Sequence, residues 1–477
     1  MSRLLKKVVT NHNFLSLANN GLVAVFGFLS FIMLVRMLPQ EDFGEWVLFI
    51  TMGNFVDMLR FGLTRTAITR FLSSAPEAEA RSLMGTNNLI NLISTLILAL
   101  LLLPTYFLFK ESISDSGFAM FFIWYPIASL FSLPFNNAQS VLQAKLRFDQ
   151  MLWLRIVNVG SFMLFLASNW YFKFGIEGIL IAYLVTNLMS SILASSLNWD
   201  GIRYIFQASR QSSRTILNFG KYTTGTLIGS NLLRSFDTLI IGLSPFLGTT
   251  GVALYSIPLK LTEIIEIPLR SFAATAFPAL SKASIENDKK KVLHLFYTNA
   301  GGLTFLLLPI MIFCFIFAEQ IVFILGGSDY IITANIFRMF CIYGLFLPID
   351  RFIGVTLDSV NRPKQNFLKV IYMASANIIG DSIAVFGFTG LLLGTSWLIL
   401  VFGKFVAPDT AYSIAHGFTM MKTLEMVAFV SILFTILGIF IGYQYLKEEL
   451  DLKFRDVFKV GFSAGVQFGL QLFRRKH

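Results

Sequence analysis

The sequence predicts an all-α polytopic membrane protein built from two six-helix lobes, with one or two further helices at the C-terminus. Hydrophobic residues make up 55% of the 477 positions and charged residues only 14%, and the mean hydropathy is +0.69. Soluble domains usually carry about 25% charged residues. The apolar residues also come in blocks, such as residues 89–109 and 426–446, which lack any charge. A helix of about 20 residues crosses a ~30 Å hydrocarbon core, so these blocks predict membrane spans.

Twelve to fourteen such spans follow one another along the chain, separated by short polar stretches. The first twelve are expected at residues 14–36, 46–66, 86–109, 117–143, 150–172, 175–197, 216–240, 251–277, 295–318, 331–357, 366–385 and 388–406. A thirteenth is expected at 423–446 and a weaker fourteenth at 457–473.

Basic residues are unevenly distributed between the two sets of loops. The odd-numbered loops up to the twelfth span contain only Arg36, Lys110 and Lys173. The N-terminus and the even-numbered loops contain Arg3, Lys6, Lys7, Arg70, Arg81, Lys145, Arg147, Arg203, Arg210, Arg214, Lys282, Lys289, Lys290, Lys291, Arg362 and Lys364. Because lysine and arginine favour cytoplasmic loops, this bias predicts a cytoplasmic N-terminus. The basic end of the chain, RRKH, then favours an even total of 14 spans, and no cleavable signal peptide is expected.

The longest polar connection among the first twelve spans separates the sixth from the seventh. We therefore predict an N-terminal lobe at 1–197, a cytoplasmic linker at 198–215, a C-terminal lobe at 216–406 and additional helices at 407–477. Weak internal similarity agrees: KFGIEGILIAYL resembles VFGFTGLLLGTS, and Gly44 before the second span matches Gly251 before the eighth. Since six is even, the two lobes form a parallel pseudo-twofold repeat, with a transport path expected between them.

Several classes of chemistry lack their sequence signals. Cys314 and Cys341 lie far apart in apolar runs and are expected to be buried hydrophobic side chains. The four histidines have no metal-ligand spacing, and no GxxxxGK[ST] loop is present, so we expect neither a metal nor another cofactor. The net charge of +11 is better explained by basic cytoplasmic loops than by nucleic acid binding.

An ordered set of motifs resembles one known family. VRMLPQEDFGEWVLFI, FGLTRTAITRFLS, RSFDTLIIGLSPFLGTTGVALYSIPLKL, AFPALSKA and LGGSDYIITANIFRMF occur in the order found in the Wzx-type oligosaccharide-lipid flippases, the polysaccharide transporter branch of the MOP superfamily. The likeness covers roughly residues 14–400. Two features depart from it: Pro39 follows residue 38 without the family's glycine, and the stretch after about residue 402 does not align.

The resemblance implies a two-lobed bundle with a V-shaped central cavity and alternating access. It also implies movement of a polyprenyl-pyrophosphate-linked sugar, such as an O-antigen unit, from the cytoplasmic to the outer leaflet of a bacterial cytoplasmic (inner) membrane. The implied partners are that glycolipid, the bilayer, H⁺ or Na⁺ as a coupling ion, and a polysaccharide polymerase complex.

The eighth span, with the sequence LTEIIEIPLR at its centre, contains an unusual cluster of charges. At 100° per residue, Lys260, Glu263, Glu266 and Arg270 all fall within about 120° of one helix face. Lys260 can pair with Glu263, and Glu266 with Arg270. Because a lone charge at bilayer depth costs at least ~2.5–3.5 kcal/mol, this face is expected to look into protein or a wet cavity.

Charges in three spans give the candidate site residues. A pyrophosphate requires lysine or arginine donors, and the candidates for binding it are Lys260, Arg270, Arg60, Arg65 and Arg234. The candidates for ion coupling are Glu263, Glu266, Asp57 and Asp237. The alternative is structural: arginines near span ends can extend to the lipid headgroups, and the cluster can be a set of stabilising ion pairs. Pro268 is a candidate hinge, with a static kink as its alternative.

Three functions are compared. A lipid-linked oligosaccharide flippase fits the mixed intramembrane charges best. A cation-coupled multidrug antiporter of the same superfamily is the main alternative, but its cavity should be mainly acidic and aromatic. A membrane-embedded glycosyltransferase or polymerase needs a long outer loop and paired carboxylates, and neither is recognisable, so we do not expect an enzyme.

Overall fold

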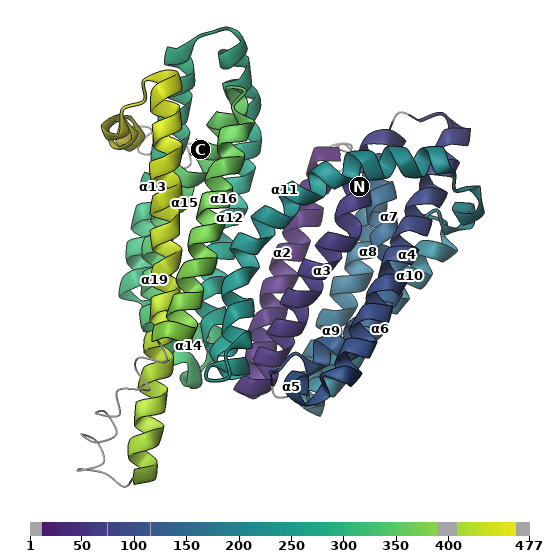
Figure 1. The fold of residues 1–477 in the computed structure, drawn as a ribbon, viewed down its shortest axis with the longest axis horizontal. Coiled ribbons are helices and arrows are strands. Elements are labelled where there is room, and N and C mark those ends of the chain that lie inside the picture. Colours follow the sequence, from purple (N-terminus) through teal and green to yellow (C-terminus); the bar gives the residue numbers. More distant parts are fainter. Residues whose placement is uncertain (1–11, 74, 115, 389–407, 464–477) are drawn as a thin grey trace, which may run out of the picture. The chain divides into compact units, whose positions relative to one another are not determined.

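The computed structural model describes residues 12–73, 75–114, 116–388 and 408–463, with side chains left out for 12–20, 221–234, 274, 388 and 408–415. All regular structure in these ranges is helical (Figure 1), which confirms the predicted fold class. The chain divides into two compact units. The first comprises Met1–Asn231 with Gly248–Thr250, and the second comprises Leu232–Leu247 with Gly251–His477. The lobe and linker boundaries expected from the sequence, and the repeat that relates the lobes, stay predictions.

The first unit is a bundle centred on the helix α3. Its helices are α2 (His12–Met37), α3 (Gln40–Leu72), α4 (Glu77–Leu108), α5 (Lys110–Ser114), α6 (Ala119–Phe131), α7 (Leu133–Ala144), α8 (Phe148–Arg155), the π-helical turn η1 (Ile156–Gly160), α9 (Ser161–Phe172), α10 (Ile176–Ser196), the 3₁₀ turn η2 (Ile202–Gln207) and the first part of α11 (Arg210–Leu243). α3 packs against α4, α6 and α7, whereas α2 packs against α8 and α9. Side chains that point inward from α3 therefore meet three other helices.

Local sequence determines where α3 and α4 begin. Pro39 and Pro76 immediately precede the two helices, where a residue without an N–H breaks no helical hydrogen bond. Glu41 and Asp42 in the first turn of α3 lie at the positive end of the helix dipole. Only 11% of the most apolar window of α4 is buried, and Phe107 and Leu108 are exposed. This face of α4 is therefore suited to contact lipid tails.

The fourth span differs from its prediction as one helix over 117–143. It consists of α6 and α7, which meet at a 49° bend after Phe131. Pro134 lies in the first turn of α7 and has no N–H to continue the hydrogen bonding of α6. Near the bend, the backbone carbonyl of Ser129 forms a hydrogen bond with α3. The side chain of Asn137 forms one with α4.

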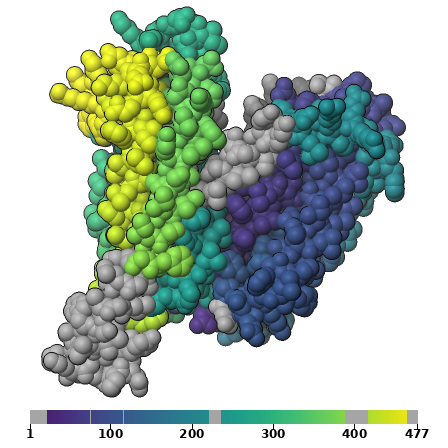
Figure 2. Space-filling model, in the orientation of Figure 1, coloured from purple at the N-terminus to yellow at the C-terminus, as the bar shows by residue number. Residues whose placement is uncertain are grey.

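The second unit is organised around α15. Its helices are the last part of α11, then α12 (Gly248–Ile285), α13 (Lys289–Ile316), α14 (Ala318–Gly326), the 3₁₀ turn η3 (Ser328–Thr333), α15 (Ala334–Ser359), α16 (Pro363–Ser382), the π-helical turn η4 (Ile383–Phe388) and α19 (Pro408–Leu450). α15 packs against both α13 and α19, and α16 lies along α19 (Figure 2). Close helix packing occurs at Gly461, where a Cβ atom would lie 2.4 Å from the Cα of Gly301.

Eight described helices are long and apolar enough to cross a membrane, or nine if the bent pair α6–α7 is one span. α11 and α12, with 34 and 38 residues, have the length to cross but contain more polar residues, and α2 is apolar from Gly21 to Met37. The expected span at 388–406 lies almost entirely outside the described residues, as does the end of the one at 457–473. The total of 12 to 14 spans stays a prediction.

Candidate functional site

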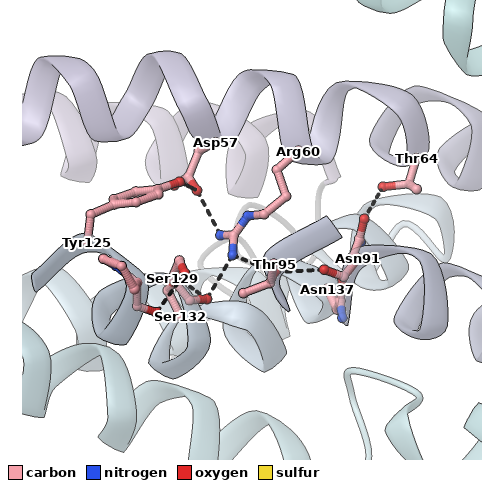
Figure 3. Close-up of polar contacts among 10 residues, drawn as sticks. Asp57, Arg60, Thr64, Asn91, Thr95, Tyr125, Ser129, Ser132 and Asn137 are labelled. Carbon is pink, nitrogen blue, oxygen red and sulfur yellow. Dashed lines mark hydrogen bonds and ion pairs between the residues drawn. The ribbon is translucent and has the colours of Figure 1, made fainter. Parts of the chain in front are cut away.

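Arg60 forms the polar centre of the first unit (Figure 3). It is only 2% exposed and is the largest fully buried side chain among the described residues. Its Nη1 donates to Thr95 Oγ1 at 2.7 Å and to the Ser129 carbonyl at 2.9 Å, and its Nη2 donates to Asp57 Oδ1 at 2.7 Å. The Tyr125 hydroxyl donates to the same Asp57 oxygen at 2.6 Å. One guanidinium thus connects α3 with α4 and α6.

This geometry bears on two candidate residues. Both Nη groups of Arg60 donate to neighbours, in three hydrogen bonds, and its Nε is the one nitrogen that lacks a partner. The described contacts therefore favour a structural ion pair over direct contact with a substrate. Asp57 is one-third exposed at its side chain and lines a cavity of about 20 Å³, together with Tyr125 and Gly53. A cavity of that size has room for roughly one water. The assignments of Arg60 to substrate and of Asp57 to ion coupling stay predictions.

A buried amide cluster continues the network along α3 and α4. Thr64 Oγ1 donates to Asn91 Oδ1 at 2.8 Å, and the Asn91 amide donates to Asn137 Oδ1 at 2.7 Å. The Asn137 amide in turn donates to Asn88 Oδ1 at 2.7 Å. These residues are fully or almost fully buried. Paired amides satisfy each other where neither water nor lipid can do so, and they hold α7 against α4.

Arg65 lies on the wall of a second cavity in the same unit. This cavity, of about 250 Å³, is lined by Val23, Phe61, Arg65, Phe135, Asn136, Gln139, Ser140, Arg155, Asn158 and Val159. Sequence reasoning did not select Arg155, although a basic residue inside the fifth span was the signal available. The prediction that Arg65 binds substrate is untested, but the side chain does reach a space that can hold a ligand.

The charges of α12 pair as the sequence predicts. Lys260 Nζ lies 2.5 Å from Glu263 Oε2, and Arg270 Nη2 lies 2.5 Å from Glu266 Oε2. The side chains of Glu263 and Arg270 are more than half exposed, whereas those of Lys260 and Glu266 are mostly buried. α12 continues as one helix through Pro268. The expected roles of these four residues in substrate binding and ion coupling, and of Pro268 as a hinge, stay predictions. The side chain of Arg234 lies outside the described residues.

Asp237 is the centre of a buried oxygen-rich cluster in the second unit. Its two carboxylate oxygens accept hydrogen bonds from the Tyr255 hydroxyl at 2.9 Å, the Ser431 hydroxyl at 3.1 Å and the Asn377 amide at 3.0 Å. The same Asn377 amide also donates to Asp381 Oδ2 at 2.9 Å. Asp237 is 5% exposed and Asp381 is fully buried. Three helices, α11, α16 and α19, and the start of α12 therefore meet at two carboxylates.

This cluster has unsatisfied acceptors. Asp381 Oδ1 and Asn377 Oδ1 are buried and have no hydrogen-bond partner. No Lys or Arg among the described residues forms an ion pair with Asp237 or Asp381, and two nearby buried carboxylates cannot both stay charged without compensation. A shared proton or a hard cation that prefers oxygen ligands supplies that compensation.

The sequence analysis selected Asp237 but missed Asn377 and Asp381. Their spacing of four residues places both on one face of α16 and was the available signal. Within the described ranges, no group of three or more His, Cys, Asp or Glu side chains is placed so that it could hold a metal ion. A cation at this position would therefore rely on the two carboxylates and on neutral oxygens such as those of Asn377, Ser431 and Tyr255.

A buried lysine was also missed. Lys369 on α16 is 2% exposed, and its Nζ donates to Asp350 Oδ1 at 2.6 Å and to the Asp350 carbonyl at 3.2 Å on α15. The partner carboxylate compensates the charge, and the pair joins two helices that also pack on α19. It is a buried ion pair that holds helices together, comparable with the Asp57–Arg60 pair of the first unit.

Comparison with known proteins identifies the family. The family described as polysaccharide biosynthesis protein matches residues 33–334, which is more than half of the chain. The chain belongs to this family. The match covers α3, α12 and α13 completely. It ends at residue 334, the first residue of α15. The sequence-based resemblance to the polysaccharide transporter branch of the MOP superfamily is confirmed.

Individual relatives agree with the family. The chain is 23% identical, over 377 residues, to the probable low-salt glycan biosynthesis flippase Agl15 of Haloferax volcanii, covering 77% of this chain and 76% of that protein. The fold is similar to an inward-facing MATE multidrug resistance transporter of the MOP superfamily, with a TM-score of 0.68, 14% identity and coverage of 89% and 94%. It is also similar to the lipid II flippase MurJ, with a TM-score of 0.64, 16% identity and coverage of 96% and 92%. The protein is thus a multi-pass membrane protein with a MATE- and MurJ-like fold.

The buried ion pair of the first unit gives a stability prediction. Replacing Arg60 by Met leaves Asp57 without its cation and should lower the free energy of unfolding by about 3 kcal/mol. The double variant Asp57→Asn/Arg60→Met should cost less than the sum of the two single variants, because neither charge is left alone.

Thermal denaturation of the purified protein in detergent measures the stability of each variant and so tests both effects. Arg81→Met is the matched control, since it breaks an exposed pair with Glu77 in the same unit and should cost less than about 1 kcal/mol. An Arg60→Met protein as stable as Arg81→Met would show that the buried pair does not stabilise the unit.

Proposed function

We propose that the protein flips a polyprenyl-diphosphate-linked oligosaccharide from the cytoplasmic to the outer leaflet of the cytoplasmic membrane, for the synthesis of a surface polysaccharide. The observation that carries this proposal is the family match over residues 33–334. The relative in Haloferax volcanii, which bears the name of a glycan biosynthesis flippase, supports it further. The fold is compatible, since MurJ, a lipid II flippase, has a similar one.

A cation-coupled multidrug antiporter is the alternative function. The fold likeness to a MATE transporter is slightly higher than to MurJ, but at 14% and 16% identity both likenesses concern the fold alone. The charges of α12 favour the flippase, because a diphosphate requires cations at its binding site and a cationic drug requires carboxylates. α12 offers Lys260 and Arg270, each with an acidic neighbour that balances it in the absence of substrate.

The transport cycle follows from this substrate. Lys260, Arg270, Arg65 and Arg234 are proposed to contribute to binding the diphosphate during transport, with the N-terminus in the cytoplasm. Alternating access then exposes the site to each leaflet in turn, with Pro268 as the proposed hinge of α12. Arg60, with most of its donors engaged inside the first unit, is proposed to hold α3 in place rather than to release its partners for a substrate. A polysaccharide polymerase complex is the proposed recipient of the flipped glycan.

The buried carboxylates of the second unit are the proposed ion-coupling site. Asp237 and Asp381 would hold Na⁺ or H⁺, and the unsatisfied oxygens of Asn377 and Asp381 fit a cation. Binding one monovalent cation there would compensate one of the two carboxylate charges and draw α11, α16 and α19 together. The free energy of that compensation gives an ion gradient a means to favour one access state.

Substitution of the basic residues of α12 tests the proposed substrate site. Lys260→Ala and Arg270→Ala should each reduce surface glycan in cells by tenfold or more while leaving the amount of protein in the membrane unchanged, since a charge-assisted hydrogen bond to diphosphate contributes about 1.5–3 kcal/mol. Glycan staining with a parallel immunoblot measures both quantities. Lys282→Ala, an exposed position near the end of the same helix, is the control. Wild-type glycan levels in both variants would remove these residues from the substrate site.

Neutralising the buried carboxylates tests ion coupling. Asp381→Asn and Asp237→Asn should make transport in proteoliposomes insensitive to an imposed Na⁺ or H⁺ gradient, because an amide cannot supply the negative charge that retains the ion. Glu319→Gln, which removes an exposed carboxylate of the same unit, should leave the gradient response intact. If both aspartate variants respond to gradients as the wild type does, the cluster is structural and not the coupling site.

A further inference from the structure

We propose that the cavity between Arg65 and Arg155 in the first unit is a binding pocket for the diphosphate and first sugar of the lipid-linked substrate. This inference rests on the proposed function and assigns Arg155 and Gln139 a role in substrate binding. The cavity of about 250 Å³ is open on one side, and its described lining residues belong to α2, α3, α7, α8 and η1, all from one unit.

The charge of the lining selects an anion. Among the described lining residues, the ionisable side chains are those of Arg65 and Arg155, and the others are amide, hydroxyl or apolar. Neither arginine pairs with a carboxylate in the part of the chain that the structure describes. Two uncompensated cations beside one cavity favour a ligand with at least two negative charges, and the planar guanidinium can bind two phosphate oxygens at once.

Gln139 provides a second, independent observation. It is 5% exposed, and its Oε1 accepts a hydrogen bond from Arg155 Nε at 3.1 Å. That contact fixes the orientation of the amide, because only the oxygen can accept from Nε. Its Nε2 is buried and has no hydrogen-bond partner. A buried donor without an acceptor is costly, and an anionic oxygen in the cavity would satisfy it.

Arg155 is oriented by the fold around it. It ends α8, and the π-helical turn η1 that follows contributes Asn158 and Val159 to the same cavity. π-turns inside α-helices often occur at functional sites. Asn158 is anchored by its amide, which donates to Asn187 Oδ1 of α10 at 3.3 Å. The bond from Arg155 to Gln139 leaves the Nη groups of the guanidinium free to contact a ligand.

The depth and the neutral lining suit a glycolipid headgroup. Arg65 lies seven residues before the end of α3 and Arg155 seven residues after the start of α8, so both lie roughly 10 Å from helix ends that are predicted to face the cytoplasm. Asn136 and Ser140 add amide and hydroxyl groups that can bind sugar hydroxyls, and Phe61 and Phe135 add aromatic surface. An ordinary anionic phospholipid shares the phosphate chemistry, but it has only one phosphate and no sugar to use these groups.

Direct binding to the purified full-length protein tests the proposal. The probes are a polyprenyl diphosphate and phosphatidylglycerol, each titrated in detergent and measured by native mass spectrometry. The wild type should bind the diphosphate at least tenfold more tightly than phosphatidylglycerol. Arg155→Lys, which keeps the charge but loses the planar fork, and Arg65→Ala should each weaken diphosphate binding by about tenfold or more.

Gln139→Glu is the sharpest variant, because it keeps the shape of glutamine while it replaces the unpaired Nε2 donor by an acceptor oxygen and adds a negative charge. Its carboxylate should pair with Arg155, so the thermal stability should not fall while diphosphate binding weakens by tenfold or more. Arg147→Ala, which removes an exposed arginine paired with Asp149 near the same end of the unit, is the matched control and should bind as the wild type does.

Three results would overturn the proposal. Wild-type affinity in Arg155→Lys and Gln139→Glu would exclude this cavity while leaving the proposed function intact. Equal affinity for phosphatidylglycerol would make it a site for bulk lipid headgroups. Failure of the wild type to bind any polyprenyl diphosphate would contradict both the pocket and the proposed function.

Discussion

Lipid tails offer no hydrogen bonds, so every polar group within the membrane spans of this protein must find its partner in the protein itself. Arg60 illustrates the constraint: a guanidinium with 2% exposure is stabilised by a carboxylate, a hydroxyl and a backbone carbonyl contributed by α3, α4 and α6. The Lys369–Asp350 pair does the same between α15 and α16. Such contacts define which helices are neighbours, because hydrophobic packing in lipid discriminates between helix arrangements less strongly than it does in water.

Among the described residues, seven buried side-chain polar atoms lack a hydrogen-bond partner, and three of them carry the functional inferences. Gln139 Nε2 beside the two-arginine cavity, and Asp381 Oδ1 and Asn377 Oδ1 beside Asp237, are buried polar atoms without a partner. In the first case the missing partner is an acceptor, and in the second it is a cation or a proton. One unit thus has the chemistry for an anionic headgroup and the other has the chemistry for a coupling ion. Arg60 Nε is also unpaired, but the rest of its guanidinium is engaged by neighbours.

An ordered set of motifs was sufficient for the family resemblance. Sequence periodicity and charge were sufficient for the helical fold and for the pairing of Lys260 with Glu263 and Arg270 with Glu266. Each depends on local spacing or on the hydropathy of a single segment. Contacts between distant segments were not accessible in this way. Asn377 and Asp381 are candidate site residues because they lie beside Asp237, about 140 residues earlier in the chain. Arg155 is a candidate because it contacts Gln139 on another helix. The span expected at 117–143 did not include the 49° bend between α6 and α7, where Pro134, which has no N–H, interrupts the helical hydrogen bonds.

Flipping by the purified protein tests the central claim most directly. The protein is reconstituted into liposomes that contain a fluorescent oligosaccharide linked to polyprenyl diphosphate, and the fraction of the glycan accessible to an external quencher or glycosidase is followed over time. Our account predicts that wild-type protein moves the glycolipid between leaflets faster than protein-free liposomes do, and that Arg155→Lys and Lys260→Ala slow this movement. A rate equal to that of protein-free liposomes, with active export of a cationic drug by the same preparation, would contradict it.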